Sequence, residues 1–284
     1  MLFRSVQFRP HSGRKCTDAR RGDGRGVATV GAVGDLVHCT IEASVATITL
    51  DSQANRNALS RQLLIELNDA LDRAADSDVR AVVLTHAGPV FCSGADLKER
   101  ASGTQDAQAA GNPMANVFER LGTLAAPTIA AVNGPVRAGG VGLMAACDLV
   151  VVNNDVTFAF TEVRIGVAPA IISVPILARC GWSKLAAPFI TGEAFDAAAA
   201  KDMGLITHVT DDVDARVAAL VTGILAGAPN AVAATKRLLR QPAPTMAEMT
   251  QLSESLFRSN EAAEGMRAFA EKRPPSWASV GKDS

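Results

Sequence analysis

The sequence predicts an α/β fold followed by a helical C-terminal segment. From Leu36 to Val209, short apolar runs typical of strands alternate with stretches that have helical period. Two glycine-rich loops, Cys92–Lys98 and Pro135–Gly140, each follow an apolar run of the kind found in parallel sheets. From Asp212 to Pro274 almost all of the chain fits a helical period. Strand–helix alternation before a helical tail indicates a parallel sheet covered by helices.

Composition and pattern divide the chain into three parts. Residues 1–34 carry seven Arg and Lys against two Asp, a net charge of +5, whereas the whole chain has −1 and the remainder therefore −6. This first part has little apolar periodicity, so we expect a disordered N-terminal extension. An Arg-rich, acid-poor leader has the composition of a transit peptide, and a basic tail or an upstream start codon read as coding is the alternative. Residues 35–210 are predicted to form the core domain, and residues 211–284 a C-terminal helical region.

The first elements of the core follow from local patterns. Two alternating strands flank Glu42–Ser44 and form a hairpin. Ser60 or Asn57 caps the next helix, whose apolar residues recur at helical spacing. Residues Arg80–His86 form a strand of the buried type. The segment Ala101–Met114 is small and polar, and we expect it to be mobile.

The central stretch, Asn133–Pro169, contains the most informative residues. A predicted strand, Pro127–Val132, leads into a glycine-rich turn, a helix of small residues and a second apolar strand. A lone carboxylate, Glu162, then ends a short Phe-rich run. Further helices are predicted at Asn116–Leu124, Ala170–Cys180, Ser183–Ile190 and Asp196–Gly204.

The glycines at the start of the small-residue helix predict an anion-binding turn. Glycines let the backbone approach a ligand, and the first N–H groups of a helix have no intrahelical acceptor. Such groups near Gly139 and Gly140 suit a developing oxyanion, where one donor is worth about 3–4 kcal/mol in the transition state. Glu162, if within reach, would supply proton transfer. Ligands bind outside the carboxyl ends of parallel strands, so both glycine-rich loops are candidates for one pocket, although glycines after strands are also common elsewhere.

Composition argues against several classes of protein. A net charge of −1 gives no global attraction to nucleic acid or to a membrane surface, and no apolar run reaches about 18 residues. The five cysteines are odd in number and form no CxxC pair, which favours a reducing cytoplasm and disfavours disulfides and zinc. Four scattered histidines disfavour a His-based triad or metal cluster. We therefore expect a cytoplasmic protein without a metal.

Six separated motifs carry a resemblance to a known family. They are ATITLDSQANRNALS, FCSGADLKE, AAVNGPVRAGGVGLMAACDLV, FAFTEVRIGVAP, AAKDMGLITHV and EGMRAFAEKRPPSW, in that order. From about Asp35 to Trp277 the chain resembles the crotonase family, also called the enoyl-CoA hydratase/isomerase superfamily. The resemblance implies a crotonase-type spiral of ββα units, with a C-terminal helical region that assembles trimers and often hexamers.

The resemblance also implies a site for an acyl-CoA thioester. By motif position, the thioester carbonyl would accept backbone N–H bonds from Ala95 and Gly139, and Glu162 would be the general acid and base. The CoA part would be contacted by Arg56, Ala58, Ala95, Asp96, Leu97, Lys98 and Gly139, and its phosphates by Lys272 of the same or a neighbouring subunit. Without the resemblance, Arg56, Lys98 and Lys272 are ordinary solvated charges. CoA is part of the substrate, and no cofactor is implied.

One position departs from the family pattern. Family hydratases carry two glutamates, and the first falls on the third residue after Gly139, where this chain has Gly142. A single carboxylate can move a proton between two carbons, as in a 3-enoyl to 2-enoyl-CoA isomerase, or activate water alone. The segment TEVRIGVAPAIIS looks closest to a branch that includes hydratases for branched or carboxylated enoyl-CoAs. We therefore expect a hydratase first and an isomerase second.

A different class of function stays open. A catalytically weakened relative would bind acyl-CoA, or RNA, without turnover. RNA binding needs a basic face, and the net charge of −6 outside residues 1–34 disfavours it. Taken without the motif match, Glu162 could be a helix-start acid that interacts with backbone N–H groups, or a partner of Arg164.

Four further residues have open roles in the sequence. Arg137 stands at a position that is usually apolar in relatives, and it could pair with an acidic group of the substrate or of the protein. Cys92 and Ser93 suggest a nucleophile, but no histidine lies near them in the sequence. Asp148 is expected to be a structural hydrogen-bonding acid at a helix end.

Overall fold

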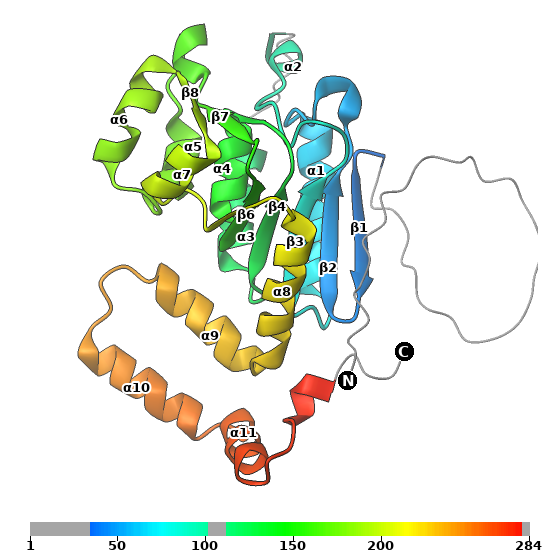
Figure 1. The fold of residues 1–284 in the computed structure, drawn as a ribbon, viewed down its shortest axis with the longest axis vertical. Coiled ribbons are helices and arrows are strands. Elements are labelled where there is room, and N and C mark those ends of the chain that lie inside the picture. Colours follow the sequence, from blue (N-terminus) through cyan, green and yellow to red (C-terminus); the bar gives the residue numbers. More distant parts are fainter. Residues whose placement is uncertain (1–34, 102–111, 280–284) are drawn as a thin grey trace, which may run out of the picture.

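The computed structural model describes residues 35–101 and 112–279. The predicted extension, residues 1–34, lies outside the described residues, as does most of the predicted mobile segment 101–114. The described chain forms a large sheet covered by helices, a small second sheet, and an arm of C-terminal helices that projects away from both (Figure 1).

The main sheet has six strands in the order β1, β2, β3, β4, β6, β9. The predicted hairpin is confirmed, because β1 (Val37–Glu42) pairs antiparallel with β2 (Val45–Leu50). All later neighbours pair in parallel, as the predicted α/β class requires. These strands are β3 (Ala81–His86), β4 (Thr128–Val132), β6 (Leu149–Asn153) and β9 (His208–Thr210).

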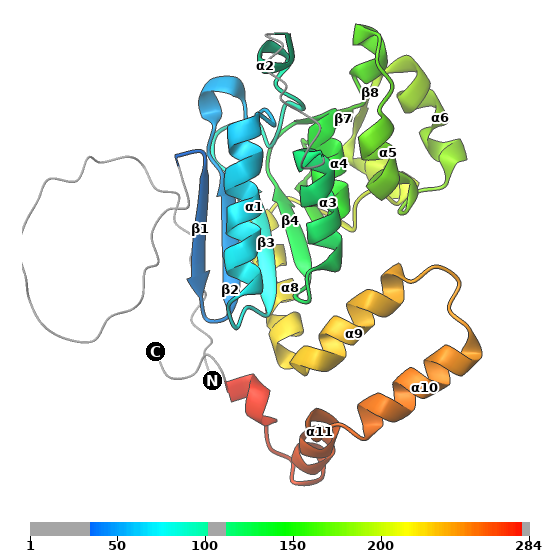
Figure 2. The same ribbon diagram turned by 180° about the vertical axis from the view of Figure 1, so that it is seen from behind.

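Helices cover both faces of the main sheet. α1 (Arg61–Ala75) and α3 (Pro113–Thr123) lie on one face, and α8 (Val213–Ala226) lies on the other (Figures 1 and 2). Ser60, one of the two predicted caps, accepts a hydrogen bond from the Leu63 N–H at 3.3 Å. α8 buries its apolar face on the sheet, so it packs with the core although it follows residue 210. Its contacts are made by Val213 and Val217 against Val83, Ile129, Ala131 and Val151.

Helix α4 (Gly139–Ala146) is buried along its whole length. It packs between α3 and α5 (Ala170–Leu177). Its residues are mostly Gly and Ala, which let neighbouring helices approach its backbone closely. A Cβ on Gly140, for example, would lie 2.7 Å from the Cβ of Cys92.

A small second sheet holds the central stretch of the sequence. Its strands lie in the order β5 (Val136–Arg137), β7 (Thr157–Ala159) and β8 (Ala194–Asp196). Three more helical elements surround it, namely the 3-10 helix η2 (Glu162–Ile165), α6 (Trp182–Thr191) and α7 (Ala197–Met203). The predicted helices after the central stretch are therefore confirmed.

The predicted C-terminal helices extend beyond the sheet as a bent arm (Figure 1). They are α9 (Pro229–Arg240), α10 (Met246–Phe257), α11 (Asn260–Ala270) and the 3-10 helix η3 (Ser276–Ser279). No residue of α10 is buried. Within the described ranges no single helix is long and apolar enough to cross a membrane, and only the bent pair α8 and α9, at 113°, passes on length and composition.

Candidate active site

Three chain segments run side by side at the edge of the small sheet. Cys92 forms a parallel bridge with Val136 of β5, and Val136 pairs in parallel with Phe158 of β7. The Arg137 N–H donates a hydrogen bond to the Cys92 carbonyl at 2.9 Å. The three segments therefore leave this register in the same direction.

This register fixes where the three predicted catalytic residues lie along their segments. Ala95 and Gly139 lie three residues beyond the aligned positions of the first two segments, and Glu162 lies four residues beyond that of the third. The Ala138 N–H donates to the Ala159 carbonyl at 2.9 Å. The chain that enters α4 is thus held against the chain that leads to Glu162.

The two glycine-rich loops touch each other. Gly94 has a φ of +98°, and a Cβ there would lie 2.8 Å from the Cβ of Ala138 and 3.5 Å from the Gly139 nitrogen. Only glycine fits at position 94, because both the positive φ and the close approach exclude a side chain. A Cβ on Gly139 would in turn lie 3.6 Å from the Ala95 nitrogen. The loops therefore meet where the sequence predicts a common site.

Ala95 and Gly139 both carry N–H groups that have no hydrogen-bond acceptor among the described residues. Gly139 is the first residue of α4, and the residue before it, Ala138, has a φ of +48° and no side-chain cap. The Gly139 N–H therefore stands at the positive end of the helix dipole. Two such donors from adjoining segments suit a single carbonyl oxygen that gains negative charge.

Glu162 lies on the third of these adjoining segments. Its Oε2 atom is buried and has no hydrogen-bond partner in the part of the chain that the structure describes. Burial raises the pKa of the Glu162 carboxyl, and its own backbone N–H opposes that shift. Arg164 donates instead to the Thr191 carbonyl at 3.4 Å, so the interpretation of Glu162 as its ion-pair partner is wrong. A half-buried carboxyl with one buried, unpartnered oxygen and a raised pKa fits a general acid and base.

The space beside Gly142 is filled by apolar side chains. A Cβ on Gly142 would lie 2.7 Å from Ile172 Cγ2 and 2.9 Å from Phe118 Cε2. Ile172 is 2% exposed and Phe118 7% exposed, so neither can swing into solvent. Position 142, where this chain departs from the family pattern, is therefore closely packed and has no room for the side chain of a second glutamate.

The loop between β2 and α1 is organised by Asn57, whose side chain is buried. Asn57 has a φ of +54°, accepts a hydrogen bond from the Ser52 N–H at 2.7 Å, and donates to the carbonyls of Ala87 at 3.1 Å and Val90 at 2.8 Å. The sequence offers Asn57 only as a possible helix cap. An Asn with a positive φ is a known turn signal, but its partners are 30 and 33 residues away and leave no local pattern.

This loop brings the first predicted CoA-binding residues beside the second loop. The Ser93 N–H donates to the Arg56 carbonyl at 3.1 Å, and the Leu59 N–H donates to the Gly94 carbonyl at 2.7 Å. The Arg56 side chain is exposed and Ala58 is buried. Both predicted residues therefore adjoin the segment that carries Ala95.

Asp96 starts the short helix α2 (Leu97–Ala101) and uses its carboxylate within the protein. Its Oδ1 accepts hydrogen bonds from the backbone N–H groups of Lys98 at 3.0 Å and Glu99 at 3.2 Å, and its Oδ2 accepts from Asn55 at 3.3 Å. The side chains of Leu97 and Lys98 are exposed. Asp96 therefore positions the loop, while its two neighbours face solvent.

Lys272 lies apart from the other predicted site residues. It follows α11, which stands at the opposite end of the molecule from α2 in both views (Figures 1 and 2). Within one chain the structure does not bring Lys272 and Lys98 together.

The open roles of other residues are resolved by their contacts. Arg137 donates to the Thr157 carbonyl at 2.6 Å and to its hydroxyl at 2.9 Å, and no carboxylate of the described residues pairs with it. Cys92 is fully buried, and burial raises the pKa of its thiol to about 12, which disfavours a thiolate nucleophile at neutral pH. The Ser93 hydroxyl donates to the Asn55 carbonyl at 3.1 Å. No group of His, Cys, Asp and Glu in the described ranges could hold a metal ion.

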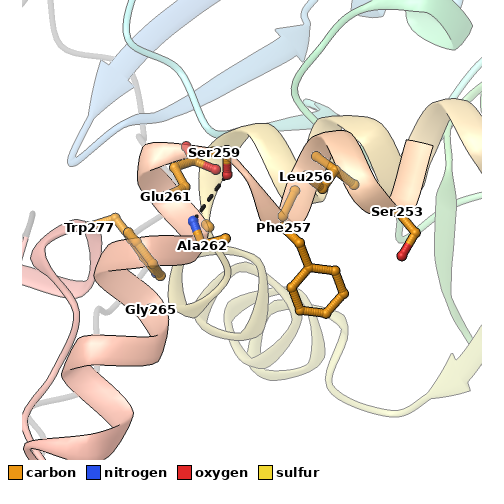
Figure 3. Close-up of a pocket in the computed structure, with 10 residues that line it drawn as sticks. Ser253, Leu256, Phe257, Ser259, Glu261, Ala262, Gly265 and Trp277 are labelled. Atoms are coloured by element: carbon orange, nitrogen blue, oxygen red, sulfur yellow. Dashed lines mark hydrogen bonds between the residues drawn. The ribbon is translucent and has the colours of Figure 1, made fainter. Parts of the chain in front are cut away.

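A separate apolar pocket lies in the C-terminal arm, away from these loops. Leu256 and Phe257 of α10, Gly265 of α11 and Trp277 line part of it, and the Ser259 hydroxyl accepts a hydrogen bond from the Ala262 N–H at its edge (Figure 3). The Phe257 side chain is 68% exposed. The pocket contains none of the predicted catalytic residues.

The sequence matches a family model and is similar to several known proteins. Residues 40–280 match the family model described as enoyl-CoA hydratase/isomerase. A Thermus thermophilus protein is 37% identical over 244 residues, which cover 81% of this chain and 96% of that protein. Enoyl-CoA hydratase EchA19 of Mycobacterium tuberculosis is 36% identical over 244 residues, which cover 81% of this chain and 91% of EchA19.

Solved structures agree with the sequence relatives. The crystal structure of an enoyl-CoA hydratase of Mycobacterium smegmatis gives a TM-score of 0.78 at 31% identity, covering 86% of this chain and 99% of that one. The structure of AtuE from Pseudomonas aeruginosa also gives 0.78, at 28% identity, covering 86% and 100%. The chain therefore belongs to the enoyl-CoA hydratase/isomerase family and has the crotonase fold that its motifs predict.

Proposed function

We propose that this acyl-CoA enzyme hydrates a 2-enoyl-CoA to a 3-hydroxyacyl-CoA, with Glu162 as general acid and base. The observation that carries the proposal is the buried Glu162 Oε2, which has no partner among the described residues and belongs to a segment that adjoins those carrying Ala95 and Gly139. The names of the relatives, including enoyl-CoA hydratase EchA19, support the same reaction.

One carboxylate is sufficient for both proton transfers of the hydration. Glu162 removes a proton from water, the water oxygen bonds to C3, and the electron pair of the C2=C3 bond moves onto the thioester oxygen. The N–H groups of Ala95 and Gly139 stabilise the enolate that results. Glu162 then returns its proton to C2. All atoms of the water end in the product, and the carboxylate is regenerated.

Isomerisation of a 3-enoyl-CoA is the second candidate. Glu162 would remove a proton from C2, the same two N–H groups would stabilise the dienolate, and the proton would return to C4. The observation that favours this reaction is the wall beside Gly142, where Ile172 and Phe118 occupy the space of a second carboxylate. Such a wall holds no polar group that would orient a water molecule.

The CoA part of the substrate is proposed to lie along the first two loops. Arg56 and Lys98 are exposed cations that suit phosphates, and Ala58 and Leu97 offer apolar contacts. We propose that the site needs no cofactor beyond the CoA of its substrate. A cytoplasmic location is proposed as well, since Cys39, Cys92, Cys147 and Cys180 are all free and buried.

A homotrimer or hexamer is proposed for the assembly. The C-terminal arm exposes large apolar side chains, which is costly in a monomer. Leu239 is 77% exposed, Met246 83%, Phe257 68% and Phe269 88%. In an assembly, Lys272 would reach the CoA phosphates of a neighbouring subunit.

Turnover of two substrates side by side tests the proposal. Wild-type protein and Glu162→Gln are incubated with a 2-enoyl-CoA and with its 3-enoyl isomer, and products are separated by mass and retention time. The proposal expects a 3-hydroxyacyl-CoA from the 2-enoyl substrate. It also expects turnover to fall about 10²–10⁴-fold in Glu162→Gln, with acyl-CoA affinity within about tenfold. Double-bond migration without uptake of water would contradict the hydratase proposal and support the isomerase. Binding of the ester without any product would overturn both the hydratase and the isomerase proposals.

A further inference from the structure

The end of helix α4 that lies opposite Gly139 is held by arginines. The Arg179 guanidinium donates from one nitrogen to the carbonyls of Cys147 at 2.6 Å and Ala145 at 3.3 Å, and from another to that of Asp148 at 3.4 Å. Arg240 donates to the Ala146 carbonyl at 2.8 Å. The last carbonyls of a helix have no intrahelical N–H donor. The two arginines supply donors to these carbonyls, which packing alone would leave unpaired.

A buried ion pair stands beside this terminus. Lys236 is only 5% exposed, and its ammonium lies 2.8 Å from Asp148 Oδ2 while it donates to the carbonyls of Leu121 and Ala126, each at 3.0 Å. Asp148 Oδ2 also accepts hydrogen bonds from Thr128, through its N–H at 2.7 Å and its hydroxyl at 3.0 Å. The expectation that Asp148 is structural is met by these contacts.

Two of the three cations come from helix α9, which begins the C-terminal arm. The Nε of Arg240 donates to Asp148 Oδ1 at 2.8 Å, so Lys236 and Arg240 each take one oxygen of the same carboxylate. A Cβ on Gly122 of α3 would lie 3.0 Å from Arg240 Nη1. Helix α9 is therefore joined to α3 and to the end of α4 by two charged side chains, of which Lys236 is buried and Arg240 is exposed.

Helix α4 connects this terminus to Gly139 at its first residue. It has eight residues, about 12 Å of helix, and all of them are buried between α3 and α5. A close-packed helix of this length moves as a unit, since its neighbours leave no free volume. Movement of its last turn would therefore shift the Gly139 N–H at its first residue. An error of about 1 Å in a catalytic group can cost about 10²-fold in rate.

We propose that Lys236 and Arg240 are positioning residues, through which helix α9 fixes α4 and thereby the Gly139 N–H that binds the thioester oxygen. The inference rests on the proposed function, because it assigns that N–H to the substrate carbonyl. It also makes the C-terminal arm part of the machinery that sets the rate, in addition to its proposed place in assembly.

The test compares Lys236→Met with Arg237→Met, an exposed neighbour on the same helix. Methionine keeps the length of the lysine side chain, and Asp148 retains Arg240 as a partner, so the variant is expected to fold. Turnover is measured with the enoyl-CoA that wild type uses, and the carbonyl stretch of a bound acyl-CoA is measured by difference infrared spectroscopy. We expect kcat to fall about tenfold or more in Lys236→Met with KM within about threefold, and the bound carbonyl to be less polarised. Arg237→Met should match wild type in both.

A second pair of variants keeps the inference testable if Lys236→Met does not fold. Arg240→Lys retains a cation near Asp148, whereas Arg240→Met does not, and we expect the first to keep more of the kcat and of the carbonyl shift. Wild-type kcat and an unchanged carbonyl band in folded Lys236→Met, or equal behaviour of the two Arg240 variants, would overturn the inference. A wild-type protein that neither turns over enoyl-CoA nor shifts the carbonyl band would instead overturn the proposed function.

Discussion

Glu162 is half-buried, and its Oε2 atom is buried without a hydrogen-bond partner among the described residues, which is costly for an ionised carboxylate. Its pKa is raised chiefly by burial, which means that the folded protein holds the ionised form less well than the unfolded chain does. Proteins retain such groups where their chemistry is used. The raised pKa of Glu162 therefore lowers the stability of the folded protein at neutral pH and, at the same time, suits the carboxyl to its proposed role in proton transfer.

The first prediction concerns the pH dependence of stability. Because the folded pKa of Glu162 lies above the ordinary value of 4.5, its contribution to stability is complete in acid and is lost as pH rises from about 4.5 through the folded pKa. Glu162→Gln removes this loss. Its thermal midpoint should therefore exceed that of wild type at pH 7 and equal it near pH 4, as measured by calorimetry. A variant less stable than wild type at pH 7 would contradict the shift.

The second prediction concerns the packed wall at Gly142. Gly142→Ala should lower the free energy of unfolding by about 1–3 kcal/mol, because its Cβ meets Ile172 and Phe118 at under 3 Å. The cost should be smaller when Ile172→Ala is already present, as a double-mutant cycle in urea would reveal. Gly223→Ala in α8 is the control, since a Cβ there meets nothing within 4 Å. Equal costs at positions 142 and 223 would contradict the packing.

The loop between β2 and α1 carries a prediction at the scale of the element. Asn57→Ala leaves the Ser52 N–H and the Ala87 and Val90 carbonyls without their buried partner, which should cost about 1–3 kcal/mol and weaken acyl-CoA binding. Gln53→Ala, whose exposed side chain bonds Asp51, should stay within about 0.5 kcal/mol of wild type. Chemical denaturation and calorimetric titration measure both effects. Unchanged affinity in Asn57→Ala would separate this loop from the CoA site.

Elements with a clear pattern could be predicted from the sequence, and short or non-local ones could not. The hairpin at Glu42–Ser44 and the buried strand Arg80–His86 have period and composition that fix their type. β5 has only two residues and β7 three, too few for any period, yet their register carries Gly139 and Glu162 to one place. Whether such short segments form strands depends on pairing with distant parts of the chain, and a single sequence does not reveal that pairing.

Site prediction has the same limit. The motifs around Ala95, Gly139 and Glu162 are long enough to predict these positions, and the segments that carry them adjoin in the structure, while their catalytic roles stay a prediction. The motif match leaves open what surrounds Gly142, since Ile172 lies 30 residues further along the chain and reaches it only through the packing of α5 on α4. The partners of Arg137 are likewise contacts across two strands.

At the scale of the whole molecule, the exposed apolar arm predicts an assembly. Wild type should have three or six times the chain mass of 29.5 kDa, as measured by light scattering after gel filtration. Phe257→Asp, on α10, should reduce that mass because it places a charge where an apolar interface is expected. Gln251→Asp, an exposed change on the same helix, should leave the mass unchanged. A monomeric wild type would remove the arm from assembly and Lys272 from the CoA site.

The most direct test of the central claim is the exchange of the α-hydrogen of a saturated acyl-CoA in D₂O. This substrate has no double bond, so neither hydration nor isomerisation occurs and only enolate formation is measured. Glu162 should remove the C2 proton, the N–H groups of Ala95 and Gly139 should hold the enolate oxygen, and a deuteron should return to C2. We expect exchange by wild type, at least about 10²-fold slower exchange by Glu162→Gln, and similar binding of the ester to both. Equal exchange rates, or no exchange by a wild type that binds the ester, would contradict this expectation.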